Sequence, residues 1–569
     1  MNPGDHPRPL QAREIKGFGS LSKNNGTVLS GPDWPPGWHR GDTNFPNHPL
    51  SSPTSLQLEP LLAPYLQLIE EREQNEAHSR LLDPRDRLKL ADLDLSAPDS
   101  AILKFCEDKA AFCHLVASSC GNSANIVEKL TSLLQRYRIQ PPSPSNENPY
   151  SIINRLTDPV WWRRQVNRIR AQAIEAVARD LGMVRKQSTP YSSVISKNRR
   201  AREKERHDEY FSKREIVASD GTRLNLSDVR AASLANPAIR RAELMTRVKG
   251  FELVAEQLRH VAEFYTITCP SRMHAYNANN KSNTKYDGTT PREANDYLNH
   301  VWQLIRASLD RKKCYPYGFR VAEPNHDGTP HWHLLLFMPA NEAALVRRII
   351  RRYALLSDPT ERGAAEHRFK AIEIDPSKGS ACQYIAKYIA KNIDGHALGN
   401  DITGVKSSIA AEHIETWAST WRIRQFQQIG GPSVGLWREL RRLKEKNSDS
   451  IEPFREAADS ANWAAFTLLM GGPRMKRCDR PLQPLRESTH RIDTVTGEII
   501  ELGLTRYGEK PAPRTIGVST TTESVITRSM IWRIEMRLED CQAHAHRAAA
   551  QSTWTSDNNC TQANTNAKH

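Results

Sequence analysis

Two histidines separated by a single residue, His331 and His333, form the clearest metal-ligating pattern in this sequence. Side chains two positions apart in a β-strand point to the same face, so the two imidazoles are expected to lie side by side. The surrounding run PHWHLLLFM is apolar on both faces and predicts a buried strand over 330–338. Buried imidazoles need polar partners, and a bound metal ion is one way of supplying them.

A carboxylate is expected to join this histidine pair. The turn sequence NHDG at 325–328 separates two strand-like runs and predicts a hairpin centred near Asp327. In that register Glu323 lies opposite His331. With His333, these residues would form a three-ligand site with open positions for substrate, and Mg²⁺ or Mn²⁺ suits phosphoryl chemistry best. The alternative is a hydrogen-bonded histidine pair beside a structural glutamate.

A second reactive group lies on one predicted helix, 380–393. Tyr384 and Tyr388 are about one turn apart, and Lys387 and Lys391 share their stripe, whereas aliphatic side chains fill the opposite face. The tyrosines are therefore predicted to lie outside the core. Because the phenol pKa is near 10, tyrosine is a poor nucleophile at neutral pH, and lysines one turn away are expected to favour the phenolate.

Together the two groups predict cleavage of a phosphodiester by tyrosine. A divalent ion would polarise a phosphodiester oxygen and stabilise the charge that develops on it. Attack by Tyr384 or Tyr388 would leave a 5′-phosphotyrosine and a free 3′-hydroxyl. Because the covalent link conserves the bond energy, the reaction would need no ATP. Two tyrosines could alternate, one holding the old 5′ end while the other cuts the new junction.

The elements that must position these groups predict an α+β domain. A helix-like segment, 251–264, runs into a strand that ends at Pro270, and a further helix begins at Pro291. The hairpin, a basic helix, another strand and the tyrosine helix follow. This order, roughly β-α-β-β-α-β-α, predicts a central antiparallel sheet flanked by helices.

Beyond this domain, local patterns predict three further features. We expect two helices separated by the break at 430–432, a hairpin over 491–509 that turns at Thr496-Gly497, and a helix within SMIWRIEMRLED at 529–540.

A basic region precedes the predicted sheet. Asp158-Pro159 is typical of a helix start, and between Trp161 and Arg206 there are thirteen Lys or Arg but only four Asp or Glu. Interleaved aromatic residues favour contact with nucleic-acid phosphates, and a solvated helix face is the equally weighted alternative. The candidate DNA-binding cations are Arg163, Arg164, Arg168 and Lys186, and the aromatic residues are Trp161, Trp162 and Tyr191.

Composition restricts the class of protein. The 569 residues carry a formal charge of +15, which favours an anionic polymer as partner. No apolar run approaches the length of about twenty residues that a membrane span needs, and the N-terminus lacks a secretory signal. The nine cysteines form no CxxC pair, and the heptad spacing of Cys106, Cys113 and Cys120 predicts a helical core stripe. A cytoplasmic protein with reduced thiols and no membrane partner is expected.

Four segments of the sequence resemble one known family. TITCPSRMH at 266–274, EPNHDGTPHWHLLLF at 323–337, YIAKYIAKN at 384–392 and WRIRQFQQIGGPSVGLWRELRRL at 421–443 look like the replication gene A protein family of temperate tailed bacteriophages and their prophages. More broadly, the strand, His-x-His and tyrosine motifs resemble the two-tyrosine HUH endonucleases that initiate rolling-circle replication. The similarity extends from about Asp158 to Glu509.

The resemblance implies a site- and strand-specific DNA endonuclease that nicks a phage origin and becomes joined to the 5′ end. It implies that His331 and His333 bind the metal and that Tyr384 and Tyr388 are the nucleophiles, whereas Glu323 as third ligand rests on the hairpin geometry. The partners that the resemblance implies are single-stranded or supercoiled origin DNA, in the bacterial host cell, and a host replicative helicase. The absence of a GxxxxGK[ST] loop from the sequence is consistent with a helicase supplied by the host.

The resemblance and the local patterns together divide the chain into seven expected regions. They are a disordered Pro-rich lead (1–65), a helical region of unknown role (66–140), a linker (141–149), a basic helical DNA-binding region (150–250), an HUH nicking endonuclease domain (251–396), a helical extension (397–450), and a hairpin-containing C-terminal region with a polar tail (451–569).

Three alternatives to a nicking initiator remain open. One is an origin-binding protein with a decayed nuclease domain, which the charge fits equally well. Another is a metal-dependent hydrolase that activates water, with the tyrosines incidental. The third is an HUH transposase or relaxase relative, which would act on a different DNA substrate.

Overall fold

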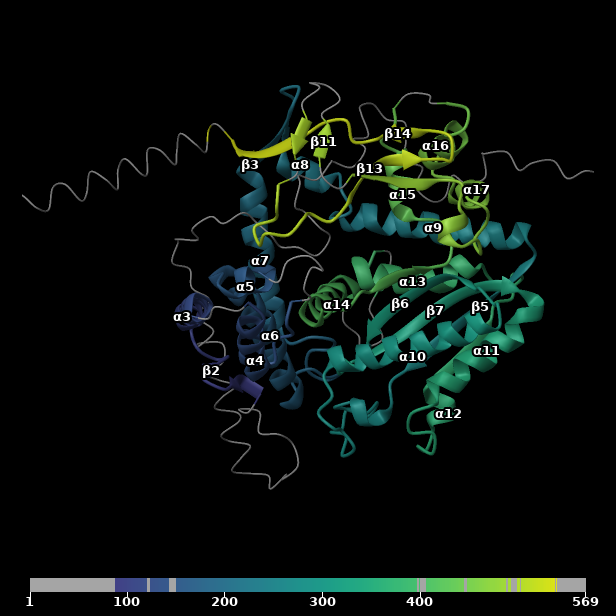
Figure 1. Ribbon diagram of the computed structural model, residues 1–569. Coiled ribbons are helices and arrows are strands. Elements are labelled where there is room, and N and C mark those ends of the chain that lie inside the picture. The colour runs from purple at the N-terminus through teal and green to yellow at the C-terminus, as the bar shows by residue number, and fades with distance from the viewer. Residues whose placement is uncertain are drawn as a thin grey trace, which may run out of the picture.

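The computed structural model (Figure 1) describes most of the chain between residues 87 and 539. The described segments are 87–119, 123–142, 150–396, 399, 406–444, 448–487, 490–492, 499–501, 503–537 and 539. The lead predicted at 1–65, the first helical run predicted after it, most of the linker predicted at 141–149 and the predicted polar tail lie outside these residues.

A five-stranded sheet forms the centre of the protein, with the strand order β8-β5-β7-β6-β9 and every neighbouring pair antiparallel. The predicted antiparallel sheet is thereby confirmed. Its strands are β5 (His260–Thr268), β6 (Tyr317–Pro324), β7 (Pro330–Pro339), β8 (Phe369–Glu373) and β9 (Phe426–Ile429).

Helices cover both faces of this sheet, as Figure 1 shows. One face packs against α10 (Pro291–Arg311) and α11 (Ala340–Ala354), with Trp332 buried between them and the sheet. The other face packs against α9 (Pro237–Gln257) and α13 (Ala381–Ile393). Both faces of β7 are therefore buried, which explains why its sequence is an unbroken apolar run rather than an alternating one.

The hairpin formed by β6 and β7 has the register that its turn sequence predicts. Glu323 pairs with His331, and Pro324 pairs with Pro330. Gly328 has φ +80°, a left-handed conformation that glycine adopts without the steric cost of a Cβ. The short turn leaves the two strands one possible alignment, so Glu323 and His331 are adjacent across the ladder.

A largely helical segment, which also contains the short strands β1 to β4, precedes the central sheet in the sequence. The remaining elements before the sheet are β1 (Lys89–Leu90), β2 (Leu93–Asp94), α3 (Asp99–Ser119), α4 (Ser123–Arg136), α5 (Tyr150–Leu156), α6 (Pro159–Asp180), α7 (Val194–Ser212), β3 (Arg214–Ala218), β4 (Arg223–Asn225) and α8 (Leu226–Ala231). Two short helices lie among the sheet strands, η1 (Ser271–Met273) and α12 (Ala364–His367).

The elements after the tyrosine helix complete the chain. They are α14 (Ser407–Trp421), α15 (Val434–Leu440), α16 (Glu452–Asp459), α17 (Trp463–Leu469), η2 (Arg477–Asp479), β10 (Gln483–Glu487), β11 (His490–Ile492), β12 (Ile499–Glu501), β13 (Arg514–Ser519), β14 (Ser524–Ile526) and β15 (Trp532–Met536). None of the helices in the described part of the chain has the length and apolar character to cross a bilayer.

Several local predictions are confirmed. Asp158 caps α6 by accepting a hydrogen bond from the Val160 amide, and Cys106 and Cys113 are buried on α3, whereas Cys120 lies outside the described residues. β11 and β12 form the expected hairpin, whose turn also lies outside them. The helix predicted at 251–264 differs in extent: α9 begins at Pro237 and ends at Gln257, and residues 260–264 belong to β5 instead.

Two predictions of helix are wrong. Between the two predicted helices, residues 426–429 form β9, which pairs with β6 and completes the sheet edge. Trp532–Met536 forms β15, which pairs with β3. In β15, Trp532, Ile534 and Met536 alternate with charged residues, so the period of two overrides the helix propensity of the segment.

One buried ion pair connects the largely helical segment to the hairpin turn. The Arg179 guanidinium on α6 lies 3.4 Å from the Asp327 carboxylate, and the two side chains are 2% and 0% exposed. Arg179 also donates to the Asp327 carbonyl at 2.8 Å, to the Met273 carbonyl at 2.8 Å and to the Thr329 hydroxyl at 2.7 Å. Burial alone would raise the pKa of Asp327, but His274 and Arg179 hold that pKa far below its usual range.

Replacing Arg179 with methionine is expected to lower the free energy of unfolding by about 3–5 kcal/mol, because the buried Asp327 carboxylate loses its arginine partner and three buried acceptors lose their donor. The measurement is chemical denaturation of the full chain. Arg223→Met is the matched control, since Arg223 is 44% exposed and ion pairs of exposed side chains contribute at most about 1 kcal/mol. Equal losses in the two variants would contradict the anchoring role of Arg179.

Candidate functional site

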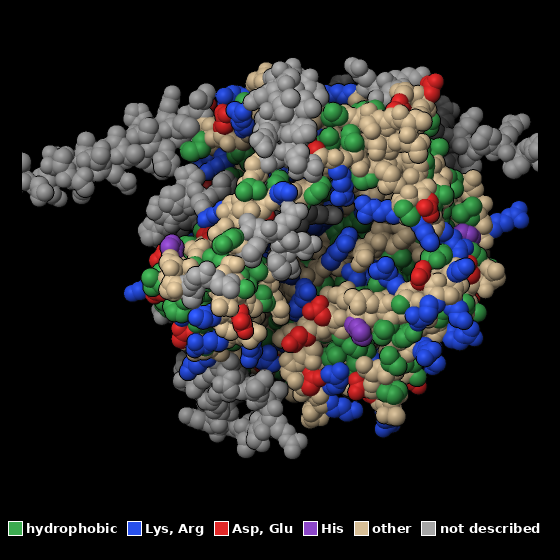
Figure 2. Space-filling model, in the orientation of Figure 1, with side chains coloured by type: hydrophobic (Ala, Val, Ile, Leu, Met, Phe, Trp, Pro, Cys, Tyr) green, Lys and Arg blue, Asp and Glu red, His purple; other side chains and the backbone are tan. Residues whose placement is uncertain are grey.

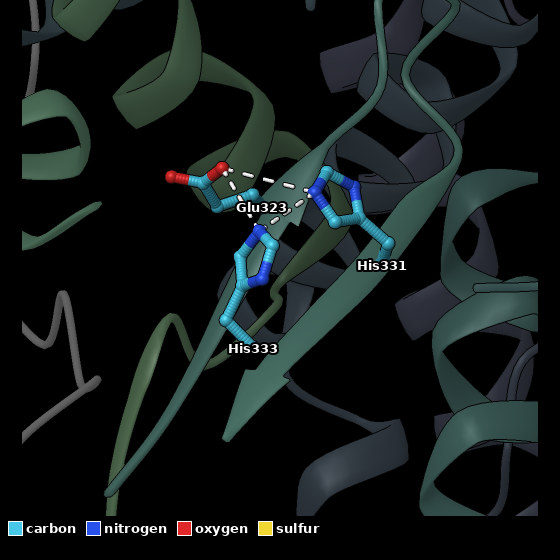
Figure 3. A group of neighbouring side chains, drawn as sticks. All are labelled: Glu323, His331 and His333. Carbon is cyan, nitrogen blue, oxygen red and sulfur yellow. Dashed lines mark hydrogen bonds and ion pairs between the residues drawn. The ribbon is translucent and has the colours of Figure 1, made fainter. Parts of the chain in front are cut away.

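Glu323, His331 and His333 converge on one point near the turn of the β6–β7 hairpin (Figure 3). The Nε2 atoms of the two histidines are 3.0 Å apart. The Glu323 Oε2 atom lies 3.8 Å from Nε2 of His331 and 3.6 Å from Nε2 of His333. The predicted three-residue convergence is therefore present in the structure.

The donor set fits a divalent cation. Two ligand atoms that share an ion at about 2.0–2.2 Å lie roughly 3–3.5 Å apart, close to the three separations found here. Burial, together with the adjacent His333, lowers the pKa of His331 to about 3, so that its ring is neutral. Burial would raise the pKa of Glu323, but His333 and the charge of Lys391 hold it at about 2. A neutral imidazole and an ionised carboxylate are the protonation states that metal ligands need.

Two polar side chains that sequence reasoning missed orient these groups. The Thr266 hydroxyl lies 3.0 Å from Nδ1 of His333, its cross-strand partner on β5. The Asn392 amide donates to Glu323 and, at 2.7 Å, to the Tyr388 carbonyl. Thr266 follows from the β5–β7 register, which the sequence does not reveal. Asn392 has a local signal, because it lies one turn beyond Tyr388 on the same helix.

The tyrosine helix begins and ends as its sequence predicts. Ser380 accepts a hydrogen bond from the Gln383 amide in a capping box, and the chain turns away at Gly395, where φ is +67°. Tyr388 lies over the metal-binding residues, with its ring centroid 4.0 Å from that of His333. Tyr384, one turn earlier, is 36% exposed. The histidine strand and the tyrosine helix thus face a common space.

The two predicted lysines occupy different positions on this stripe. The Lys391 ammonium is 3.7 Å from the Glu323 carboxylate and 5.2 Å from the centroid of the Tyr191 ring. The Lys387 ammonium is exposed and lies 5.5 Å from the centroid of the Tyr388 ring. The expectation that these lysines lower the tyrosine pKa is wrong for Tyr388, whose pKa is raised by burial and by the Glu323 carboxylate.

The surface near the tyrosine helix is hollowed and basic. Figure 2 shows Lys and Arg side chains gathered around a hollow that, by comparison with Figure 1, lies near α13, between α9 and α10. A concave basic surface attracts polyanions, because the potentials of neighbouring cations add within it.

The predicted DNA-binding cations lie on α6 and, for Lys186, in the segment that follows it. No described contact joins Arg163, Arg164, Arg168 or Lys186 to the metal-binding residues or to the tyrosines. The interleaved aromatic side chains are 0–7% exposed and belong to the core, so they are not available to stack on bases; they are Trp161, Trp162 and Tyr191. Their burial removes the aromatic support for phosphate contact over a solvated helix face, the equally weighted alternative.

Comparison with known proteins finds that this chain is similar to phage replication proteins. A model of the bacteriophage replication gene A protein (GPA) family matches residues 99–396. The chain is 38% identical over 423 residues to the probable replication protein P12 of Pseudoalteromonas phage PM2, and 37% identical over 427 residues to the replication gene A protein of Escherichia phage 186. A prophage-like region of Salmonella paratyphi A encodes a probable replication endonuclease that is 33% identical over 447 residues.

These matches cover 72%, 72% and 75% of this chain but 61%, 59% and 54% of the respective relatives. The chain thus spans less than two thirds of the length of the relatives that it matches. No solved structure is significantly similar to it.

Mn²⁺ binding measured by calorimetry tests the proposed donor set. Glu323→Gln is expected to abolish measurable binding, because one of three donors loses its charge. Thr266→Val removes the hydroxyl beside Nδ1 of His333 with little change in shape and is expected to weaken binding about 10–100-fold. Thr467→Val, a buried threonine outside the site, serves as the matched control and is expected to bind as the unmodified protein does. Unchanged binding in Glu323→Gln would exclude the site.

Proposed function

This chain belongs to the bacteriophage replication gene A protein family, and from this membership and the geometry of its site we propose that it is a metal-dependent DNA endonuclease. Its proposed role is to nick one strand at a phage or prophage origin and so to initiate rolling-circle replication. The observation that carries the proposal is the contact between Tyr388 and a candidate metal ligand. The ring centroids of Tyr388 and His333 are 4.0 Å apart, and His333 belongs to the Glu323–His331–His333 group.

In the proposed nicking step, a tyrosine replaces the 3′ oxygen on phosphorus. The phenolic oxygen of Tyr388 forms a bond to the scissile phosphorus as the bond from phosphorus to the 3′ oxygen breaks. The phenol loses its proton and the 3′ oxygen gains one, so the products are a 5′-phosphotyrosine and a 3′-hydroxyl. Tyr388 is the proposed first nucleophile because it is the tyrosine in contact with a metal-binding histidine.

The side chains of the site are proposed to support this step by binding a cation and by orienting the nucleophile. A divalent cation, Mg²⁺ or Mn²⁺, held by Glu323, His331 and His333 would supply Lewis-acid stabilisation of the phosphoryl oxygens. Asn392 fixes both the Glu323 carboxylate and the Tyr388 backbone, so it sets the distance between ligand and nucleophile. The pKa of Tyr388 is raised by burial and by Glu323, so the phenol must lose its proton during the reaction.

The second tyrosine and the two lysines complete the proposed site. Tyr384 is exposed one turn from Tyr388 and is proposed to accept a second strand after the first is held covalently. Lys387, which is also exposed, is proposed to contact the phosphates of the bound strand, whereas Lys391 holds Glu323 in its ionised form.

The remaining proposals concern fold and partners. The antiparallel sheet with the histidine strand at its centre is proposed to be an HUH endonuclease fold. The proposed partners are single-stranded or supercoiled origin DNA and a host replicative helicase, and the proposed location is the cytoplasm of the bacterial host. The four α6-region cations are retained only as proposed phosphate contacts, because their aromatic neighbours are buried.

Incubation of the full chain with labelled single-stranded origin DNA and Mg²⁺ is expected to yield a complex that survives denaturation. Tyr388→Phe is expected to reduce adduct formation at least about 100-fold, since the nucleophilic hydroxyl is lost. Tyr384→Phe is expected to retain the first cleavage and lose strand transfer, and the double variant is expected to form no adduct. Tyr353→Phe, a half-buried tyrosine on α11, is the matched control.

Each rival function predicts a different pattern. Cleavage that persists in the double variant would show a water-activating hydrolase. Specific origin binding by the unmodified protein without any adduct would show a binding protein. Preference for hairpin ends over origin DNA would favour a transposase. Any of these three results would overturn the proposed function.

A further inference from the structure

A second basic surface lies beside the edge strand β9, apart from the metal-binding residues. It is a cavity of about 1030 Å³ between α10, the loop that follows β9, and the segment that leads into β10. Neither the metal-binding residues nor the tyrosines line it. We call this cavity the β9 groove. Its basic lining residues are Arg306, Arg424, Arg474, Lys476, Arg477 and Arg480.

The charge of the β9 groove is not neutralised from within. Asp310 is the sole acidic residue in its lining. Arg474 pairs with Glu342, and buried Arg480 donates to three backbone carbonyls, so both have structural partners. The other four cations are exposed, and no ion pair is found for them within the described residues; they are Arg306, Arg424, Lys476 and Arg477.

The positive charge continues beyond the lining. Arg320 on β6 is 4% exposed, and no carboxylate in the described part of the chain pairs with it. Its guanidinium instead lies 3.9 Å from the centroid of the Trp332 ring and 3.2 Å from the Arg424 carbonyl. Burial, and the neighbouring charge of Arg424, lower the pKa of Arg320 to about 10. Clustered cations without counter-charges destabilise a folded protein, so an external anion that pairs with them would be bound favourably.

The walls of the β9 groove are held in place by the fold. The Gly431 amide donates to the Pro473 carbonyl at 2.8 Å, which joins the two loops on either side. Gly430 and Gly431 have φ +63° and +69°. A Cβ on Gly431 would lie 2.4 Å from the Phe251 ring, so only glycine allows the loop to approach the core this closely. The groove is therefore formed before any ligand arrives.

The β9 groove and the candidate active site meet at two consecutive residues. Arg424 lines the groove, and Gln425 donates to the side-chain oxygen of Asn392 at 3.2 Å. Asn392 in turn donates to Glu323. One end of the groove, at Arg424 beside the edge strand β9, is thus next to a residue that contacts the network around Glu323.

We infer that the β9 groove binds the sugar–phosphate backbone of DNA that flanks the nicked position. This inference rests on the proposed function, because it takes the ligand of the groove to be the same DNA that enters the active site. The lining favours the backbone over the bases: it is rich in arginine, and its aromatic side chains, Trp302 and Tyr315, are buried or half-buried. Contacts of this kind carry no sequence preference.

The test compares two triple variants of the full chain that remove the same charge. The groove variant carries Arg306→Gln, Arg424→Gln and Arg477→Gln. The control carries Arg348→Gln, Arg351→Gln and Arg352→Gln on the exposed face of α11. Affinity for labelled oligothymidine, and for a duplex of the same length, is measured by fluorescence anisotropy as salt is varied. Thermal melting verifies that both variants are folded.

The groove variant is expected to bind at least about tenfold more weakly at moderate salt, and its salt slope is expected to fall by about 2, or about 0.7 for each lost single-strand phosphate contact. A loss of affinity confined to oligothymidine would identify single-stranded DNA as the ligand of the groove. An equal loss of affinity for the duplex would identify double-stranded DNA beside the nicked position as the ligand. Lys476→Glu is expected to weaken binding in the same way through a single exposed residue.

Two outcomes overturn the inference. One is a groove variant whose DNA affinity and salt slope are unaltered, and the other is a control variant that loses as much DNA affinity as the groove variant. A covalent-adduct assay on a short origin oligonucleotide distinguishes failure of the groove inference from failure of the proposed function. The groove variant should still form that adduct, since its active-site residues are intact. Failure of the unmodified protein to form any adduct would instead disprove the nuclease while leaving the groove measurement interpretable.

Discussion

The contact between Arg179 and Asp327 is the constraint on which the candidate site depends. Asp327 occupies the turn of the hairpin that carries Glu323 and His331, and its carboxylate also accepts hydrogen bonds from the Ala275 amide and the Thr329 hydroxyl. Since every polar group in this buried cluster needs its partner, alternative turn conformations are costly. The turn therefore has one conformation, and through it the ligand strands have one register.

Burial favours the neutral form of both the histidine ligand His331 and the nucleophile Tyr388, but the consequence differs for the two groups. It keeps His331 neutral, while Lys391 and His333 keep Glu323 ionised, so the ligands are prepared for a cation. The same burial raises the pKa of Tyr388, so its phenol is held in the protonated form until substrate is present. Asn392 connects the two halves, because it binds the Glu323 carboxylate and the Tyr388 carbonyl at once.

Cationic side chains with and without acidic partners lie on different parts of this basic protein. On α6 and α7 many arginines are neutralised, as Arg170 is by Asp99 and Arg200 is by Glu415. The four exposed cations of the β9 groove have no comparable partners within the described residues. Net charge alone favours an anionic partner, but the arrangement of counter-charges decides which surface meets it.

The sequence by itself determined the features that depend on neighbouring residues: the β6–β7 register from a short turn, the buried character of β7, and the stripe of Tyr384 and Tyr388 on a capped helix. Only the tertiary structure decided what depends on distant residues. Thr266 meets His333 across 67 positions, and Asn392 meets Glu323 across 69. Trp162 and β9 were misread for the same reason, since burial and strand pairing are set by partners far along the chain, which local periodicity does not encode.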